Sequence, residues 1–237
     1  MSVQSQFRKY LRSYPEWRFR PPHVQVKRSM QKLGSDYGGY FVDRSMIPPE
    51  AAVYSVGIGK DITFDLSLIE SAGVEIQAFD PTPTVKKWIA SQSLPPEFHF
   101  HETGIAGFDG EAAFYPPPKE DWVSHSMIPL RRYRGESIRV AMIRLGTAMR
   151  SQGHNRIDVL KMDIEGAEYA VIEDLVRERI PVRQLLVEFH HALLSGGIEK
   201  TRETLALLDA YGMKIAHVCP RMEVFTLILA TEETGPA

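Results

Sequence analysis

The stretch of sequence that decides the fold is Val159-Leu160-Lys161-Met162-Asp163-Ile164-Glu165-Gly166-Ala167-Glu168-Tyr169. A short apolar strand is followed by three acids and then by the start of an amphipathic helix. Carboxylates at the end of a buried strand are costly unless they have a partner or bind a ligand. In an open α/β sheet, ligands bind at the carboxyl ends of the strands. The stretch therefore predicts an α/β sheet with a site where this strand ends.

The composition limits the class of protein. A chain of 237 residues, 43% hydrophobic and 24% charged, suits one globular α/β domain with additions, or at most two small domains. No apolar run approaches the roughly 18 residues that a membrane span needs, and Met1 to Tyr14 shows no apolar core of a signal peptide. Cys219 is the only cysteine, which excludes an internal disulfide and a cysteine metal cluster. We expect a cytoplasmic protein with no membrane partner.

The N-terminal segment is basic, with eight Lys and Arg residues between Met1 and Lys32 against one acid, Glu16. We predict a basic helical cap over residues 1–45, helical from Ser2 to Leu33 with breaks at prolines, and a second domain over residues 46–237. The basic face is either solvated or covers an acidic pocket or an anionic substrate. The rest of the chain is acidic and carries no nucleic-acid recognition motif, so we expect no nucleic-acid partner.

Strand and helix patterns alternate along the second domain, which predicts a parallel sheet covered on both faces. The last two strand patterns are joined by a short turn near Pro220, so they form a hairpin and the final strand is antiparallel. Residues 111–115 and 138–142 are expected to be extended, and the proline-bearing residues 116–135 to form a surface excursion. Strands are predicted at residues 52–56, 74–79, 98–102, 157–162, 184–189, 213–218 and 224–230.

Two turns predict a nucleotide-type pocket. Gly57-Ile58-Gly59 ends the first strand, and Asp80-Pro81 ends the second. The glycines let the backbone turn tightly and approach a ligand, and an acid about 20 residues further on can bind ribose hydroxyls. The signal is weak by itself because a short Gly-x-Gly is common.

The details of the first turn favour S-adenosylmethionine over a dinucleotide. The dinucleotide fingerprint needs Gly or Ala three residues after its second glycine, and this chain has Ile62 there. Asp61 and Asp65 would repel a pyrophosphate at the start of the following helix. S-adenosylmethionine has no phosphate and carries a sulfonium and an ammonium, so an acidic turn suits it. As alternatives, Asp61 caps the helix and Asp65 is an exposed acid of its first turn.

Three segments of the chain resemble the signature segments of the FkbM-type methyltransferases. They are Tyr54 to Asp65, Leu160 to Glu168 with its Lys-x-Asp-Ile-Glu-Gly-x-Glu pattern, and Leu186 to His191. The resemblance covers roughly residues 34–230. It implies a Rossmann-like, seven-stranded, mostly parallel sheet with an antiparallel C-terminal hairpin strand and helices on both faces. It also implies S-adenosylmethionine as the methyl donor and, usually, O-methylation of a hydroxyl.

The first turn departs from the wider class of these enzymes. Ser55 stands where an acid is common, and Asp61 stands where a third glycine is common. The acid that holds the methionine amine is therefore left open between Asp61 and Asp163. The predicted cofactor-binding residues are Tyr40, Gly57, Ile58, Gly59, Asp61, Asp80, Pro81 and Asp163.

In the topology that the resemblance implies, the predicted catalytic residues lie on two neighbouring strands. Side chains alternate along a strand, so Asp163 and Glu165 at one strand end should converge with Glu188 and His190 at the next. Methyl transfer to a hydroxyl needs alignment and removal of the hydroxyl proton. His190 is a candidate base because its ordinary pKa is near neutral. Glu188 orients it or pairs with Lys161.

Several alternatives stay open at these positions. His190 has a structural or substrate-contact role as its main rival, and Glu168 is expected to complement a helix dipole. His191 is expected to be exposed. Asp163, Glu165, Glu188 and His190 could also bind a divalent metal, but no tight ligand spacing supports it, so we assign no metal ligands and leave the use of a metal open. Tyr40, after a Gly-Gly pair, either walls the donor pocket or belongs to an ordinary turn.

The sequence therefore predicts an S-adenosylmethionine-dependent O-methyltransferase that acts on a small molecule or a sugar. The rivals are an NAD(P)-dependent Rossmann oxidoreductase and an inactive module that binds S-adenosylmethionine. The sequence does not identify the acceptor. It also leaves the oligomeric state open, and a homo-oligomer is possible.

Overall fold

The computed structural model describes residues 22–116, 125–129 and 136–230. The predicted helix between Ser2 and Pro21 lies outside the described residues, as does most of the proline-bearing excursion. Within the described ranges, no helix is both long enough and apolar enough to span a membrane.

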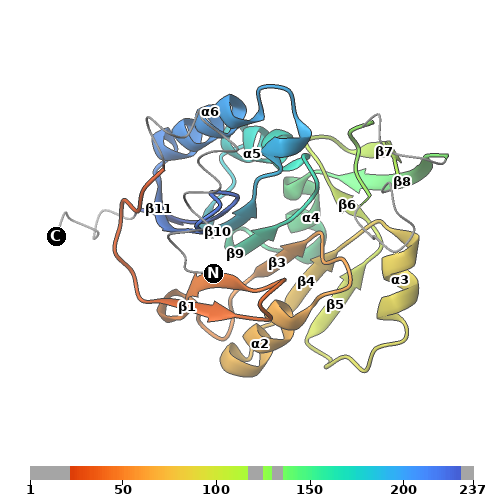
Figure 1. The fold of residues 1–237 in the computed structure, drawn as a ribbon. Helices are drawn as coiled ribbons and strands as arrows, with labels where there is room; N and C mark the ends of the chain where they lie inside the picture. The colour runs from red at the N-terminus through yellow and green to blue at the C-terminus, as the bar shows by residue number, and fades with distance from the viewer. Residues whose placement is uncertain (1–21, 117–124, 130–135, 231–237) are drawn as a thin grey trace.

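A seven-stranded sheet forms the centre of the molecule, in the order β11-β12-β10-β9-β3-β4-β5 (Figure 1). The five strands from β10 to β5 are parallel, and β12 is antiparallel to both of its neighbours. This confirms the predicted Rossmann-like α/β fold with its antiparallel C-terminal hairpin. The strands are β3 (Val53–Val56), β4 (Ile76–Phe79), β5 (Phe98–His101), β9 (Ile157–Met162), β10 (Val182–Glu188), β11 (Met213–Val218) and β12 (Val224–Leu229).

The register of the central strands brings their carboxyl ends level. Met162, the last residue of β9, lies opposite Val56 at the end of β3 and Val187 near the end of β10. All of β9 is buried, as expected for a strand covered on both faces. The acids that follow β9 therefore emerge between the ends of β3 and β10.

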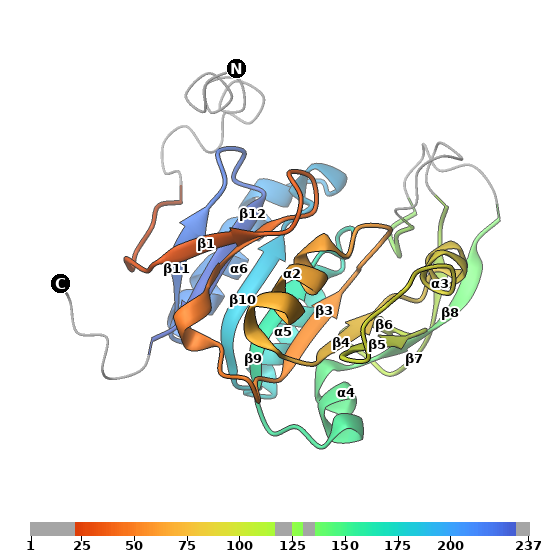
Figure 2. The ribbon, with the colours of Figure 1, turned by 90° about the horizontal axis from the view of Figure 1, so that it is seen from below.

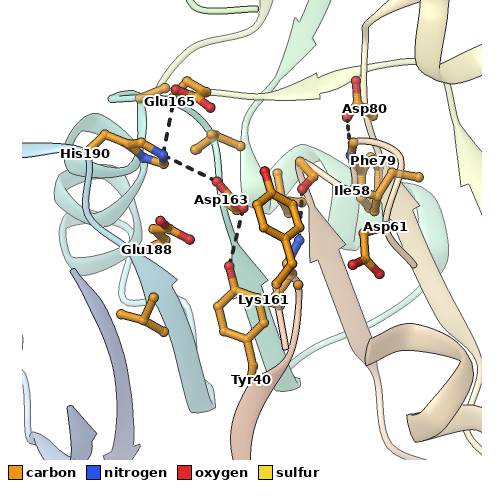
Figure 3. A pocket seen from close by; sticks show the side chains of 18 of the residues that line it. Tyr40, Ile58, Asp61, Phe79, Asp80, Lys161, Asp163, Glu165, Glu188 and His190 are labelled. Atoms are coloured by element: carbon orange, nitrogen blue, oxygen red, sulfur yellow. Dashed lines mark hydrogen bonds and ion pairs between the residues drawn. The ribbon is translucent and has the colours of Figure 1, made fainter. Parts of the chain in front are cut away.

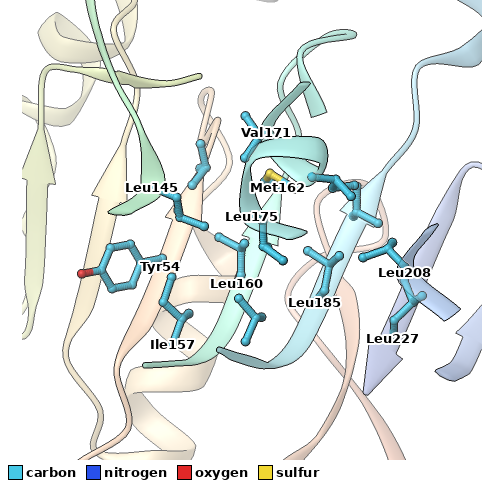
Figure 4. Close-up of a cluster of buried hydrophobic side chains, with 14 of the residues drawn as sticks. Tyr54, Leu145, Ile157, Leu160, Met162, Val171, Leu175, Leu185, Leu208 and Leu227 are labelled. Carbon is cyan, nitrogen blue, oxygen red and sulfur yellow. The ribbon is translucent and has the colours of Figure 1, made fainter. Parts of the chain in front are cut away.

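Helices cover both faces of the sheet (Figures 1 and 2). On one face, α4 (Leu145–Gln152), α5 (Glu168–Arg177) and α6 (Gly197–Ala210) pack on the sheet through a continuous apolar cluster (Figure 4). On the other face lie α2 (Thr63–Ala72) and α3 (Pro83–Ile89). Along α5, Tyr169, Ile172 and Leu175 are buried, a helical spacing that turns one apolar stripe to the core.

A small second sheet flanks the main one. Its strands are β6 (Gly104–Ile105), β8 (Ile138–Ile143) and β7 (Gly110–Phe114), in that order. The extended segments predicted near residues 111–115 and 138–142 are confirmed. Their pairing in a separate sheet, antiparallel to each other, was not predicted.

The predicted helix is wrong for residues 22–33. The chain forms an antiparallel hairpin there, β1 (Met30–Leu33) with β2 (Tyr40–Asp43), followed by the short 3₁₀ helix η2 (Arg44–Met46). The hairpin is held by distant residues: the Gln184 side chain bonds both the N–H and the C=O of Asp43, and Thr226 Oγ1 donates to the carbonyl of Phe41. These tertiary bonds override local helix preference. The division of the chain at residue 45 stays a prediction.

Candidate functional site

A cavity of about 1430 Å³ opens at the carboxyl ends of β3, β4, β9 and β10 (Figure 3). Figure 3 shows two ends of this cavity. The loop end contains Ile58, Asp61 and Asp80, and the carboxylate end contains Asp163, Glu165, Glu188 and His190. All residues that the sequence predicts for cofactor binding and catalysis line this cavity: Tyr40, Gly57, Ile58, Gly59, Asp61, Asp80, Pro81, Asp163, Glu165, Glu188 and His190.

The glycine turn needs Gly57 for two reasons. Its φ is +74°, in the left-handed region that glycine tolerates best. A Cβ atom here would lie 1.8 Å from the carbonyl oxygen of Asp163. The backbone of the turn therefore packs directly on the backbone that follows β9, and the turn and the acidic strand end form one unit.

Asp80 fixes the other side of the turn. Its Oδ2 accepts from the N–H of Gly59 at 3.1 Å and its Oδ1 from the N–H of Thr82 at 2.9 Å. The side chain is 5% exposed, yet it borders the cavity. Each carboxylate oxygen has a second lone pair, so Asp80 can hold the turn and still accept a hydrogen bond from a ligand hydroxyl.

Asp61 caps the start of α2. Its Oδ1 accepts from the N–H and the hydroxyl of Thr63, and its Oδ2 accepts from Ser35 Oγ at 2.7 Å. Burial alone would raise its pKa, but these hydrogen bonds lower it below the ordinary value. Asp61 is thus ionised at neutral pH on the wall of the loop end, so the capping role and a ligand role are compatible.

Lys161 and Tyr40 lie between the two ends of the cavity. Lys161 Nζ donates to the carbonyl of Gly57 at 2.8 Å and sits 5.4 Å from the Tyr40 ring centroid. It makes no ion pair with Glu188, so the predicted structural pair between these two residues is absent from the described contacts. The Tyr40 hydroxyl donates to Asp163 Oδ2 at 3.5 Å. Burial and the charge of Asp163 raise its pKa, so it remains a donor.

Three side chains converge at the carboxylate end. His190 Nε2 lies 3.5 Å from Asp163 Oδ1 and 3.7 Å from Glu165 Oε2. Asp163 and Glu165 follow β9, and His190 follows β10, so parallel pairing of these strands brings the three groups together. The predicted convergence of the two strand ends is therefore observed.

Glu168 contacts both the backbone N–H and the Nδ1 atom of His190. It is fully buried, and its Oε1 accepts from the backbone N–H of His190 at 2.6 Å and lies 3.4 Å from His190 Nδ1. Its Oε2 accepts from the N–H of Gly166 at 2.8 Å, just before α5. Glu168 is the first residue of α5, where the role of complementing the helix dipole stays a prediction, and its carboxylate in addition orients the imidazole, which the sequence did not reveal.

The electrostatics of the site favour a protonated His190. Burial alone would lower the pKa of His190. The hydrogen bond and charge of Glu168, with the charges of Asp163 and Glu165, instead raise that pKa to about 10. In this state the imidazole donates to carboxylates, whereas a general base must accept a proton.

Glu188 differs from the other acids of the carboxylate end. Its side chain makes no hydrogen bond or ion pair with the described residues, and it borders the cavity. Burial, followed by the charge of Asp163, raises its pKa to about 7, against the opposing effect of His190. Glu188 is therefore a carboxylate that a ligand proton can reach.

Ser126 is a supporting residue that sequence analysis missed. It is fully buried, and its hydroxyl donates to the carbonyl of Glu165 at 2.8 Å. Glu165 has a φ of +51°, and this bond helps to hold that backbone. A serine in a proline-bearing segment has no sequence pattern that predicts this contact.

His191 was predicted to be exposed. It is instead 2% exposed and begins the 3₁₀ helix η3 (His191–Leu193).

Asp65 lies beneath the site and was expected to be exposed. It is 1% exposed, and neither carboxylate oxygen has a hydrogen-bond partner in the described structure. The first turn of α2 lies on the sheet, which turns this side chain inward. Burial raises the pKa of Asp65 from 3.8 to about 6, although Lys161 opposes the rise.

Asp65→Asn is expected to stabilise the protein at pH 8. A carboxyl group whose pKa is raised by folding destabilises the native state once it ionises, and a shift to about 6 corresponds to roughly 3 kcal/mol. The gain should shrink as pH falls from 6 and vanish below 3.8, where Asp65 is protonated in both states. Urea unfolding at several pH values measures it. Glu70→Gln, an exposed change on the same helix, should shift stability by less than about 0.5 kcal/mol, and an equal effect of both changes would contradict this account.

Comparison with known proteins bears on the family. A sequence model described as "Methyltransferase FkbM domain" matches residues 42–215. A human protein described as "Probable methyltransferase-like protein 24" is 29% identical over 145 residues, which is 60% of this chain and 33% of the relative. The rat protein of the same description is 30% identical over the same length. The chain thus spans about a third of the length of these relatives.

Two solved structures align with this chain at low sequence identity. The crystal structure of Methyltransferase FkbM from Methylobacillus flagellatus KT aligns with a TM-score of 0.47 at 12% identity, over 77% of this chain and 44% of that one. Aeropyrum pernix fibrillarin, in complex with natively bound S-adenosyl-L-methionine, aligns with a TM-score of 0.41 at 11% identity, over 88% of this chain and 84% of that one.

Proposed function

Because the chain belongs to the FkbM methyltransferase family, we propose that it transfers a methyl group from S-adenosylmethionine to a hydroxyl of a small molecule or a sugar. The observation that carries the proposal is the single cavity that joins the glycine turn to the carboxylate end. Single-ligand pockets have volumes of roughly 300–1,000 Å³, and this cavity is larger. It has room for a donor and an acceptor side by side.

The loop end suits the donor. The backbone at Gly57 and Gly59 permits close approach of a ligand, and Asp80 can accept from ribose hydroxyls. No phosphate has to be bound next to Asp61, whose negative charge is compatible with the positive sulfonium and ammonium groups. Asp61 and Asp163 remain the two candidates for the methionine amine.

The carboxylate end suits the acceptor. In the transfer, the hydroxyl oxygen forms a bond to the methyl carbon, the carbon–sulfur bond breaks, and S-adenosylhomocysteine leaves. The hydroxyl proton has to be removed in the same process. We assign the proton acceptor to Glu188, because it is unpartnered and borders the cavity, whereas His190 is held between carboxylates. His190, Asp163 and Glu165 then position the acceptor.

The acceptor class can be tested with donor labelled at its methyl carbon. The protein is incubated with ¹³C-methyl S-adenosylmethionine and a panel of sugars, polyols and phenols, and the products are followed by NMR and mass spectrometry. We expect S-adenosylhomocysteine together with a label whose chemical shift is that of a methyl ether. A label on nitrogen, carbon or sulfur would contradict the assignment to a hydroxyl.

A further inference from the structure

We propose that Asp163, Glu165 and His190 form a binding site for a divalent metal ion at the carboxylate end of the cavity. We propose further, and this part rests on the proposed function, that the bound ion holds the oxygen of the acceptor hydroxyl. The sequence offered no close ligand spacing for such a site, because its members come from the ends of two strands.

The three donor groups already surround a common point. One ligand atom from each residue can be chosen so that all three lie within 4.8 Å of one another. The two measured separations from His190 Nε2 are 3.5 Å to Asp163 and 3.7 Å to Glu165. Ligand atoms at about 2.1 Å from one metal ion lie roughly 3–3.5 Å apart. The two separations from His190 Nε2 are thus close to those of ligands on a shared ion, and the ligand atoms of Asp163 and Glu165 lie within 4.8 Å of each other.

The imidazole is oriented as in a metal site. Metal-bound histidines usually direct their second ring nitrogen to a carboxylate, which fixes the ring and strengthens the ligand. Here Glu168, fully buried, lies 3.4 Å from His190 Nδ1 and is itself held by two backbone N–H groups. His190 Nε2 is consequently turned toward Asp163 and Glu165. This support comes from Glu168 at the start of α5, which is not itself one of the three proposed ligands.

Lys161 does not supply a cation to the three proposed ligands, and a bound ion would replace the proton of His190. Lys161, which lines the cavity, directs its Nζ to the carbonyl of Gly57 instead of to the carboxylate end. Two carboxylates and one imidazole are donors that suit Mn²⁺, among other first-row divalent ions. All three proposed ligands line the cavity. Open coordination positions would therefore face the acceptor.

The chemistry of the transfer is consistent with this site. A metal-bound hydroxyl loses its proton more readily than a free one. The proton passes to Glu188, the oxygen forms its bond to the methyl carbon, and S-adenosylhomocysteine leaves with the electron pair of the broken carbon–sulfur bond. The ion keeps its charge throughout, so no oxidant or reductant is required.

Titration of the full chain with Mn²⁺ alone, followed by electron paramagnetic resonance, tests the site without any activity measurement. We expect saturable binding of one Mn²⁺ per chain. Glu165→Gln should weaken binding by at least about tenfold, and Glu168→Gln, which removes the negative charge beside His190 Nδ1 without removing a proposed ligand, by about 10–100-fold. Asp36→Asn is the matched control: it removes an exposed carboxylate at the same cavity and should leave Mn²⁺ affinity unchanged.

The results separate this proposal from the proposed function. Circular dichroism and thermal unfolding establish that each variant is folded. No Mn²⁺ binding to the unaltered chain, or equal binding to folded Glu165→Gln, would overturn the metal site. If S-adenosylmethionine binds in the same preparation, the proposed function survives that outcome. If Mn²⁺ binds as expected and S-adenosylmethionine does not, the metal site stands and the proposed function fails.

Discussion

Gly57→Ala is expected to abolish binding of S-adenosylmethionine, with a loss of affinity of at least about 100-fold. The added Cβ would lie 1.8 Å from the carbonyl oxygen of Asp163, far inside any tolerated contact, so the turn and the strand end have to separate. The left-handed φ of +74° adds roughly 1–2 kcal/mol. Calorimetry measures the affinity, and thermal unfolding measures the accompanying loss of stability.

Gly59→Ala is the matched control for this change. Gly59 also has a left-handed φ, of +54°, but a Cβ there meets nothing within 4 Å. Its cost should be limited to the backbone conformation, and donor affinity should fall much less than in Gly57→Ala. Similar affinities for the two variants would mean that the contact between the glycine turn and Asp163 does not shape the donor site.

Glu188→Gln is expected to lower turnover by about 100- to 10,000-fold, the usual contribution of a general base. The amide keeps the shape of the side chain but cannot accept the hydroxyl proton. Because Glu188 lies at the carboxylate end, away from the glycine turn (Figure 3), the dissociation constant of S-adenosylmethionine should stay within about twofold. Turnover with the acceptor from the labelling experiment and calorimetry of the donor measure the two effects separately.

Asp36→Asn serves as the control for turnover as well, because Asp36 is exposed and, within the described part of the chain, pairs with Lys32 at the cavity rim. It should leave turnover unchanged. Near-normal turnover in Glu188→Gln would remove Glu188 as the proton acceptor. If His190→Gln then abolished turnover without a change in Mn²⁺ affinity, the role of base would return to His190.

Local sequence predicted the individual strands, and the strand order implied by the family resemblance predicted the convergence of the site. The strand β9 was predicted with its observed limits because a buried parallel strand is a continuous apolar run. Asp163, Glu165 and His190 could be brought together because the topology makes β9 and β10 neighbours and side-chain alternation fixes which residues share a face. The sequence pattern and the strand order together were enough to predict that these three side chains lie close together.

The features that were missed depend on contacts between distant segments. The hairpin β1–β2 is held by Gln184 and Thr226, which lie more than 140 residues further along the chain. Asp65 is buried because α2 packs on the sheet. The sequence around Asp65 does not distinguish it from an exposed acid in the first turn of a helix. Glu168 also orients His190. This role depends on the folded structure, in which the end of β10 places His190 next to the start of α5.

Calorimetry of the unaltered chain with S-adenosylmethionine, S-adenosylhomocysteine and NAD tests the central claim most directly, because the account rests on a cavity built for a methyl donor. We predict that S-adenosylmethionine and S-adenosylhomocysteine bind at one site per chain and compete with each other, and that NAD neither binds nor displaces them. Binding of NAD with no binding of S-adenosylmethionine would contradict the account.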